Sequence, residues 1–273
     1  MVKNILPYIT EHREYVEPFF GGGSVFFAKR PAKVETINDL NSDVMNFFRV
    51  LRDESKEFLR LARLTPYSRE LYHDCLKTYK EESDLVKRAW KWFVVARMSF
   101  GGMLGVCWGN VVKSSGRGMA GTCSRFLLSV DCLPQVIARL KRAQIENVSA
   151  LTVIERYTTE NSLCYCDPPY VSSTRKSGGY EDEMTDEDHE KLLELLLETK
   201  GKVVVSGYPN ELYEDYLGDW YKVEFEVACH AAARTRNSKL QGKGSVLKHA
   251  ARTEVLWLNE KAFRASGEQL SFL

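Results

Sequence analysis

Short apolar runs alternate along most of the chain with stretches in which apolar residues recur at helical spacing. Runs rich in β-branched and aromatic residues, bounded by turn residues, are typical of buried strands. The sequence therefore predicts strands at residues 15–19, 34–37, 145–148, 162–166, 202–206, 221–228 and 253–258.

The intervening stretches predict helices. Two of them begin at Ser24 and Thr185, and helical spacing also continues through residues 44–51, 84–98 and 133–142. Three acids follow Thr185, where a hydroxyl cap and negative charge both suit the positive end of a helix dipole. Because strands alternate with helices, we expect a parallel α/β sheet.

The segment from residue 52 to residue 142 has a different pattern. Its ends are helical, but residues 100–125 are rich in glycine, basic and aromatic residues and show no clear period. A long irregular segment in a compact protein is usually functional or mobile. We therefore expect residues 1–51 and 143–273 to form the α/β domain, with residues 52–142 inserted into it.

The composition is that of an ordinary globular protein of 273 residues, 44% hydrophobic and 27% charged. No apolar run approaches the roughly 20 residues that a membrane helix needs, and the N-terminus lacks the pattern of a secretory signal. We expect a cytoplasmic protein. The seven cysteines are scattered without a Cys-x-x-Cys pair, which indicates neither a zinc site nor a disulfide framework, and we expect no metal.

The net charge is only +1, but the charges are unevenly distributed. No acid occurs in residues 85–130 or 227–253, and each of these spans carries several Lys and Arg, while acids concentrate in residues 181–198. Such polarity attracts a polyanion whatever the total charge. The alternative is a pair of solvated basic loops, but two long acid-free spans in a chain with 37 acids favour nucleic acid.

Three predicted strand ends carry residues suited to ligand binding, which in doubly wound sheets occurs at the carboxyl ends of strands. The first strand runs into three glycines and Ser24, and the second ends at Asp39. Glycines let the backbone approach a ligand closely, and a carboxylate at a strand end can accept both hydroxyls of a ribose.

The third strand end, Asp167-Pro168-Pro169-Tyr170, is the most informative. Two prolines fix the backbone and remove two N–H donors, so their carbonyls remain as rigidly held acceptors. A carboxylate, a fixed carbonyl and an aromatic ring then lie at one point. The alternative is a rigid turn with a capping Asp and a packed Tyr.

These motifs, in this order, resemble those of the Dam-like DNA adenine-N6 methyltransferases of the D12 class, alpha group. The resemblance spans nearly the whole chain and rests on Tyr15–Ser24, Ile37–Asp39, Cys166–Tyr170, Val204–Tyr208 and Arg252–Trp257. It implies a Rossmann-like α/β methyltransferase sheet with an inserted, mainly helical DNA-recognition region. It also implies S-adenosylmethionine as cofactor, double-stranded DNA as substrate, and a bacterial or phage source.

The resemblance further implies two sets of site residues. The cofactor set, with Asp39 on the ribose, comprises Glu17, Phe19, Gly21, Gly22, Gly23, Ser24, Asn38, Asp39, Ser149 and Asp167. The catalytic set comprises Asp167, Pro168, Pro169 and Tyr170. Asp167 and the Pro168 carbonyl would accept hydrogen bonds from the adenine amino group, and Tyr170 would stack on the flipped base.

The chemistry explains these residue types. An adenine amino nitrogen is a weak nucleophile because its lone pair is delocalised into the ring. Two acceptors on its hydrogens localise the pair, so that the nitrogen can attack a sulfonium methyl in line. Asp167 need not be a strong base, since positioning and electrostatics do most of the work and the proton can leave afterwards. The base must first be flipped out of the duplex.

Other substrates and roles fit the same motifs. The acceptor geometry would serve the N4 of cytosine or an adenine in RNA, and a DNA-binding protein that has lost catalysis is an alternative from another class. The chain also departs from the family at two places. Only Lys3 stands where the family has Gly-Gly-Lys, and Ser149 stands where an acid is expected beside the cofactor adenine.

The first acid-free span supplies the candidates for DNA contacts, which are Arg97, Asn110, Lys113, Arg117 and Arg125. Arg and Asn can read the edges of guanine and adenine, whereas Lys mostly contacts phosphate. For any single one of them, a phosphate contact or a plain surface role is the alternative.

The chain ends Gln269-Leu270-Ser271-Phe272-Leu273. This resembles the short peptides by which bacterial DNA enzymes bind the replication sliding clamp, although the last two apolar residues are reversed. We expect a free tail after the last strand, whose apolar side chains suit a hydrophobic pocket on a partner. The alternative is that these side chains pack on the protein's own surface.

Overall fold

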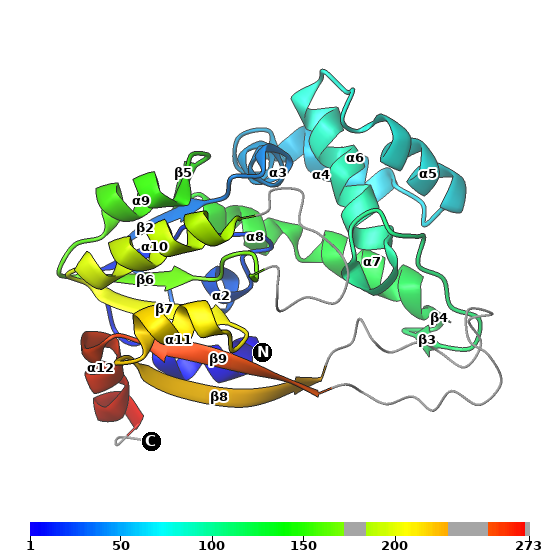
Figure 1. Cartoon of the computed structure of the whole chain (residues 1–273). Helices are drawn as coiled ribbons and strands as arrows, with labels where there is room; N and C mark the ends of the chain where they lie inside the picture. Colours follow the sequence, from blue (N-terminus) through cyan, green and yellow to red (C-terminus); the bar gives the residue numbers. More distant parts are fainter. Residues whose placement is uncertain (172–183, 229–250, 271–273) are drawn as a thin grey trace, which may run out of the picture. The chain divides into compact units, whose positions relative to one another are not determined.

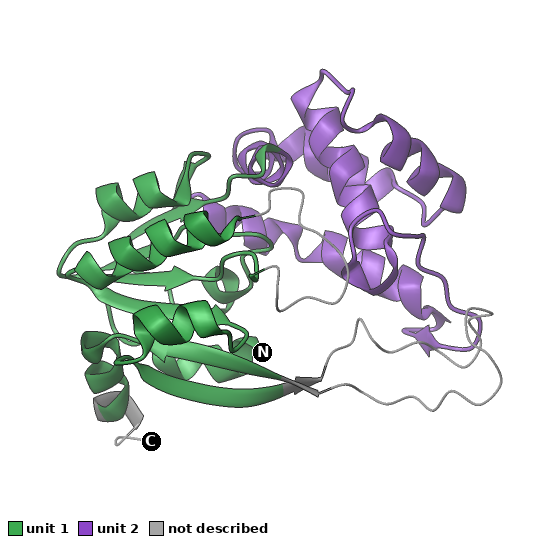
Figure 2. Ribbon diagram, in the orientation of Figure 1, with its two compact units in different colours: residues 1–42, 143–229, 249–273 green, residues 43–142, 230–248 purple. Residues whose placement is uncertain are grey.

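The computed structural model describes residues 1–171, 184–228 and 251–270 of the chain. They form two compact units, coloured separately in Figure 2. The first contains residues 1–42 and the described residues from 143 onward, and the second contains residues 43–142. The sequence predicts divisions after residues 51 and 142, whereas the contacts divide the chain after residues 42 and 142.

A seven-stranded sheet forms the centre of the first unit, with the strand order β5-β2-β1-β6-β7-β9-β8 (Figure 1). The five strands from β5 to β7 are parallel, whereas β9 is antiparallel to both β7 and β8. This architecture confirms the predicted Rossmann-like sheet. The strands are β1 (Glu14–Glu17), β2 (Val34–Asn38), β5 (Gln144–Glu146), β6 (Ser162–Cys166), β7 (Lys202–Gly207), β8 (Tyr221–Ala228) and β9 (Ala251–Leu258).

Helices cover both faces of this sheet, which explains the apolar runs in its central strands. Every residue of β6 is buried, as expected for a parallel strand between two helical layers. One layer contains α9 (Ala150–Tyr157), α10 (Asp186–Glu198) and α11 (Glu211–Leu217). On the other face lie α1 (Val2–Ile5), the short helix η1 (Leu6–Tyr8), α2 (Ser24–Ala28) and α12 (Glu260–Leu270) (Figure 1).

The predicted start of α10 is confirmed in detail. The Thr185 hydroxyl accepts a hydrogen bond from the Asp188 backbone N–H at 3.2 Å, and the Asp188 carboxylate accepts one from the Thr185 N–H at 2.9 Å. This reciprocal capping box satisfies two backbone donors that the first turn of a helix leaves unpaired.

The chain after β9 corrects the prediction of a free tail. Helix α12 begins two residues after β9, and its Ala262 and Ser266 are buried. Asn259 fixes the turn, because its Oδ1 accepts from the N–H groups of Ala262 and Val203, and its Nδ2 donates to the Gly201 carbonyl. Residues 269 and 270 therefore belong to a packed helix, and residues 271–273 lie outside the described residues.

The second unit is mainly helical and has an aromatic core. Phe47 stacks on Phe93 at 5.8 Å between ring centroids, and Phe58 and Phe126 contact Phe93 from other directions. A partly buried ion pair between Arg88 and Asp43, with 2.5 Å between Nε and Oδ1, joins two of the helices. The unit comprises α3 (Ser42–Asp53), α4 (Ser55–Leu64), α5 (Arg69–Thr78), α6 (Leu85–Met98), the short helix η2 (Phe100–Gly102), the hairpin of β3 (Ser115–Gly116) and β4 (Met119–Ala120), α7 (Gly121–Asp131) and α8 (Leu133–Leu140).

Helix α7 was not predicted from the sequence. Its first turn is Gly-Thr-Cys-Ser, which has low intrinsic helix propensity and merges with the glycine-rich stretch before it. The structure buries Thr122, Phe126 and Val130, which lie at intervals of four on one face. This helix forms because its apolar face packs on the aromatic core, and packing outweighs its local propensity.

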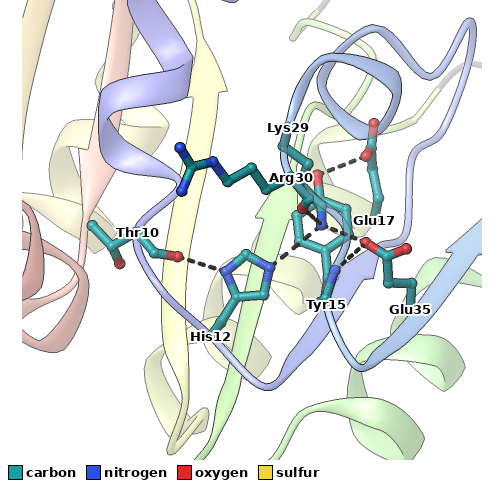
Figure 3. A network of polar contacts seen from close by, with 8 residues as sticks. Thr10, His12, Tyr15, Glu17, Lys29, Arg30 and Glu35 are labelled. Carbon is teal, nitrogen blue, oxygen red and sulfur yellow. Dashed lines mark hydrogen bonds and ion pairs between the residues drawn. The ribbon is translucent and has the colours of Figure 1, made fainter.

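A buried ion pair joins the residue after α2 to β2 (Figure 3). Lys29 Nζ lies 2.5 Å from Glu35 Oε1 and 3.9 Å from the centroid of the Tyr15 ring. The Ala32 backbone N–H donates to the same carboxylate oxygen at 2.9 Å. The charge of each partner is thus matched although both side chains are buried, which is the condition for a tolerable buried ion pair.

His12 completes this network as a neutral side chain. Burial and, to a smaller extent, the positive charge of Lys29 lower the pKa of His12 to about 4. His12 Nδ1 lies 2.6 Å from the Thr10 carbonyl oxygen and must carry the hydrogen of that bond. The unprotonated Nε2 then accepts from Lys29 Nζ at 3.4 Å.

The Lys29–Glu35 pair gives a prediction for stability. Lys29→Met should lower the free energy of unfolding by about 3–5 kcal/mol, because it leaves the buried Glu35 carboxylate without its countercharge. The double variant Lys29→Met/Glu35→Gln should recover most of that loss, since the amide oxygen can still accept from Ala32. Denaturant unfolding of both variants measures this, and equal losses in the two would contradict it.

Candidate active site

The loop after β1 combines a rigid turn with an open backbone. Gly21 and Gly23 have φ values of 46° and 65°, in the left-handed region that favours glycine. A Cβ at Gly23 would lie 2.4 Å from the Phe20 ring, whereas a Cβ at Gly21 or Gly22 would meet nothing within 4 Å. The loop is therefore fixed at one glycine and open at two, where a ligand can approach the peptide groups.

Asp39 ties the end of β2 to this loop. Its Oδ2 accepts from the Gly21 backbone N–H at 2.7 Å, and its Oδ1 accepts from the Asn41 N–H at 2.9 Å. The side chain is half-buried. The glycine loop and the predicted ribose-binding carboxylate are thus neighbours, as their places at adjacent parallel strand ends require.

Asn38 is fully buried and acts within the protein. Its Nδ2 donates to the carbonyls of Pro18 and Val148 at 2.9 and 3.0 Å, and its Oδ1 accepts from the Val148 N–H at 3.0 Å. It therefore fastens the loops after β1 and β5 to each other. Ser149, which follows Val148, is exposed at the start of α9, and Phe19 is half-buried against the sheet's apolar core.

Asp167 lies directly after β6, in the middle of the sheet. The Ser206 hydroxyl, on the neighbouring strand β7, donates to Asp167 Oδ1 at 2.9 Å. Burial raises the pKa of Asp167 to about 6, and the Ser206 hydrogen bond opposes that rise. Pro168 is buried, and Pro169 and Tyr170 are half-buried.

Glu17 ends β1, two strand positions from a buried tyrosine. The Tyr15 hydroxyl donates to Glu17 Oε2 at 2.6 Å (Figure 3). Burial raises the pKa of Glu17 to about 8, and the charge of Asp167 contributes to the rise. Because the Tyr15 ring also lies against Lys29, the buried network described above extends to this side of the site.

A third acid, Glu254, comes from the antiparallel strand β9. It lies at the same edge of the sheet because its neighbour Val255 pairs with Gly207, the last residue of β7. Its side chain is buried, and the Tyr170 hydroxyl donates to its Oε1 at 3.3 Å. Burial and, to a smaller extent, the charge of Asp167 raise the pKa of Glu254 to about 7.

Three acids thus lie at one edge of the sheet, and one of them ionises more readily than the other two. Glu17, Asp167 and Glu254 each have a raised pKa, and Asp167 has the lowest, near 6. At neutral pH Asp167 is therefore mostly a carboxylate and a hydrogen-bond acceptor. Such a site can accept from an amino group and can stabilise a neighbouring positive charge.

Glu254, Tyr208 and Ser206 were given no role in the sequence analysis, although they lie in segments that carry the family resemblance. Tyr208 packs on Tyr170, with 4.2 Å between the ring centroids. No local pattern could have identified Glu254, since 84 positions of sequence separate it from Tyr170. The available signal was only that an acid directly precedes the apolar run Val255-Leu256-Trp257-Leu258.

All five predicted DNA-contact residues are exposed on the second unit. Arg97 lies in the last turn of α6, Asn110 and Lys113 lie in the following loop, and Arg125 lies on α7. Arg117 differs, because its guanidinium donates to the Ser124 hydroxyl and carbonyl and lies 3.6 Å from Asp131. The Arg117 guanidinium is therefore held against α7 and is less available to a ligand. Most of the second acid-free span, residues 229–250, lies outside the described residues.

A further basic residue escaped the sequence analysis because it lies outside the acid-free spans. The exposed guanidinium of Arg69, at the start of α5, lies 4.7 Å from the centroid of the Trp108 ring. Trp108 immediately precedes Gly109 and Asn110 in the glycine-rich loop. Arg69 thus joins the same loop as two of the predicted contacts.

Among the helices that the structure describes, none has the length and apolarity to cross a membrane.

Several known proteins are similar in sequence to this chain. A type II methyltransferase of Lactococcus lactis subsp. cremoris, M1.LlaDCHI, is 25% identical over 94% of this chain and 92% of its own length. A DNA adenine methylase of Vibrio cholerae is 28% identical over 63% of this chain and 61% of its own length.

A DNA N-6-adenine-methyltransferase of Escherichia phage P1 is also similar, at 26% identity over 79% of this chain and 30% of its own length. The sequence model of one family, described as D12 class N6 adenine-specific DNA methyltransferase, matches residues 1–232. That match includes the glycine loop, Asp39 and the Asp-Pro-Pro-Tyr motif. The chain belongs to the D12 class of N6 adenine-specific DNA methyltransferases.

Proposed function

We propose that this enzyme transfers a methyl group from S-adenosylmethionine to the N6 of an adenine flipped out of double-stranded DNA, with Asp167 and the Pro168 carbonyl accepting from the amino group. The observation that carries this proposal is the position of Asp167. It stands at the end of a central parallel strand, is held by Ser206, and is followed by two prolines. Its pKa near 6 keeps the acceptor ionised at neutral pH.

The methyl donor would bind across the first two strand ends. The open backbone of Gly21 and Gly22 and the carboxylate of Asp39 are adjacent there, and a ribose hydroxyl can donate to a carboxylate. When bound, S-adenosylmethionine supplies an activated methyl group on a positively charged sulfur. The Asp167 carboxylate, which is mostly ionised at neutral pH, would provide negative potential that favours this charge.

The protein's own groups would prepare the acceptor nitrogen. Asp167 and the Pro168 carbonyl each accept one amino hydrogen, which directs the nitrogen lone pair out of the plane of the base. Tyr170 offers a ring face for stacking. The partial burial of Asp167 and Tyr170 would limit their contact with water and so strengthen each of these interactions.

The second unit would bind DNA through its exposed basic residues, and we propose it as the recognition region. Arg97, Lys113 and Arg125 form no ion pair within the described residues, so their charges are available for phosphates. Arg117, which is held by Ser124, is a weaker candidate.

The sliding-clamp hypothesis for residues 269–273 has no support in the described structure. Two of these residues lie in α12 and the other three lie outside the described residues. The family's specificity for adenine in DNA also favours that substrate over cytosine N4 and RNA.

The catalytic proposal predicts that Asp167→Ala lowers methyl transfer at least about 100-fold while DNA binding stays within a few-fold of normal. The substitution removes an acceptor at the amino group and adds no positive charge. The rate of methyl transfer is measured with a tritiated methyl donor and adenine-unmethylated genomic DNA. DNA binding is measured by fluorescence anisotropy with a DNA duplex. Near-normal turnover would refute the assignment of Asp167.

The cofactor proposal predicts that Asp39→Ala weakens S-adenosylmethionine binding about tenfold or more without unfolding the protein. It removes both the ribose acceptor and the anchor of the Gly21 backbone. Isothermal titration calorimetry measures the affinity. Glu160→Ala, an exposed acid before β6, serves as the control and should bind normally; an unchanged affinity in Asp39→Ala would place the ribose elsewhere.

The DNA-binding proposal predicts a steep decline of DNA affinity with salt. Lys113→Ala should reduce the slope of log K against log salt by about one, because one phosphate contact is lost. Lys56→Ala, an exposed lysine on α4 of the same unit, is the matched control and should keep the wild-type slope. Affinity that does not change with salt would contradict the charge argument.

A further inference from the structure

Glu254 is a buried acid that forms no ion pair with a Lys or Arg side chain among the described residues. Only 4% of the residue is exposed. Burying a carboxylate is unfavourable unless hydrogen bonds or countercharges compensate. An apolar residue would fit strand β9 better, since its neighbours Val255, Leu256 and Trp257 are all buried and apolar.

The main compensating groups are two tyrosine hydroxyls beside the Asp-Pro-Pro-Tyr motif, and the positive charge of the N-terminus adds a smaller contribution. The Tyr170 hydroxyl lies 3.3 Å from Oε1 and 3.5 Å from Oε2 of Glu254, and a Tyr208 hydrogen bond also stabilises the charged form. The two rings lie against each other, with 4.2 Å between centroids and 35° between planes. Glu254 thus contacts the hydroxyl ends of a pair of packed rings.

Tyr170 is thereby held at both ends. Its backbone follows Pro168 and Pro169, which restrict the chain, and its hydroxyl is directed to Glu254. Its ring is also flanked on one side by Tyr208. An aromatic side chain fixed in this way loses little freedom when a base stacks on it.

We propose that Glu254 is a positioning residue, which holds the Tyr170 ring in the orientation that receives the flipped adenine. This inference rests on the proposed role of Tyr170 as the stacking partner. Glu254 acts through the hydroxyl of Tyr170 and does not itself contact the base. The stacking surface is thus organised before DNA binds, and the acid is retained for this purpose at the expense of stability.

The test uses Glu254→Leu, Tyr170→Phe and the double variant, assayed for methyl transfer to adenine-unmethylated genomic DNA. Each single variant should lower kcat/KM for DNA by about tenfold, which corresponds to the freezing of one side chain. The double variant should lose no more than either single variant, because both remove the same hydrogen bond. The dissociation constant of S-adenosylmethionine should stay unchanged.

A stability measurement separates positioning from a structural role. Glu254→Leu should leave the melting temperature unchanged or raise it, since an apolar side chain replaces a buried acid. Glu254→Gln keeps one acceptor for the tyrosines and should retain activity between those of the wild type and Glu254→Leu. If Glu254→Leu does not fold, the Glu254→Gln and Tyr170→Phe variants and their combination carry the same test.

The outcomes distinguish this inference from the proposed function. Wild-type activity in Glu254→Leu, or losses that multiply in the double variant, would overturn the role of Glu254. Tyr170→Ala, which removes the ring, tests the stacking role separately. If Tyr170→Ala is inactive while Glu254→Leu and Tyr170→Phe are normal, only the inference about Glu254 fails. If Tyr170→Ala is fully active, the stacking role itself fails.

Discussion

Parallel strands end at a common edge of the sheet, and the chemistry proposed for this protein depends on that constraint. Strands β1, β6 and β7 lie side by side, so Glu17, Asp167 and Ser206 meet although long stretches of chain separate them. Strand β9 runs in the opposite direction, and a residue in its first half, Glu254, therefore reaches the same edge. Side chains from one amino-terminal, one central and one carboxy-terminal segment thus form one site.

Two ways of burying an acid are present in the same unit. Glu35 is matched by the ammonium group of Lys29, so the pair is neutral in sum and serves the fold. Asp167, Glu17 and Glu254 are instead stabilised by the hydroxyls of Ser206, Tyr15 and Tyr170. Hydroxyl donors favour the ionised form without cancelling its charge. At neutral pH the ionised Asp167 gives the strand ends a negative potential that a cationic methyl donor could use, and the raised pKa values of Glu17 and Glu254 reflect the cost of burying acids without a countercharge.

The second unit combines an aromatic core with exposed basic side chains. Its stability comes from aromatic rings packed between helices, which leaves the long glycine-rich loop and the hairpin without a large core of their own. Basic side chains such as Arg97 and Lys113 are therefore exposed on elements that are anchored at their ends. This is the arrangement expected of a surface that must adapt to a nucleic acid, where contacts are made mainly by long flexible cations.

The sequence alone determined the sheet, the order of its motifs and the family. Apolar runs predicted central strands such as β6 and β7, because a strand buried on both faces must be apolar along its length. The edge strand β8 was predicted from its alternation of apolar and charged residues instead. The strand-end motifs around Gly21, Asp39 and Asp167 were recognisable because glycine, proline and acids are unfavourable in apolar runs. Only tertiary structure decided the rest. Helices α7 and α12 form because one face of each is buried by distant segments, which local propensity cannot anticipate. The meeting of Glu254 with Tyr170 depends on the antiparallel register of β9 on β7, and a register is a relation between strands that neither strand encodes by itself.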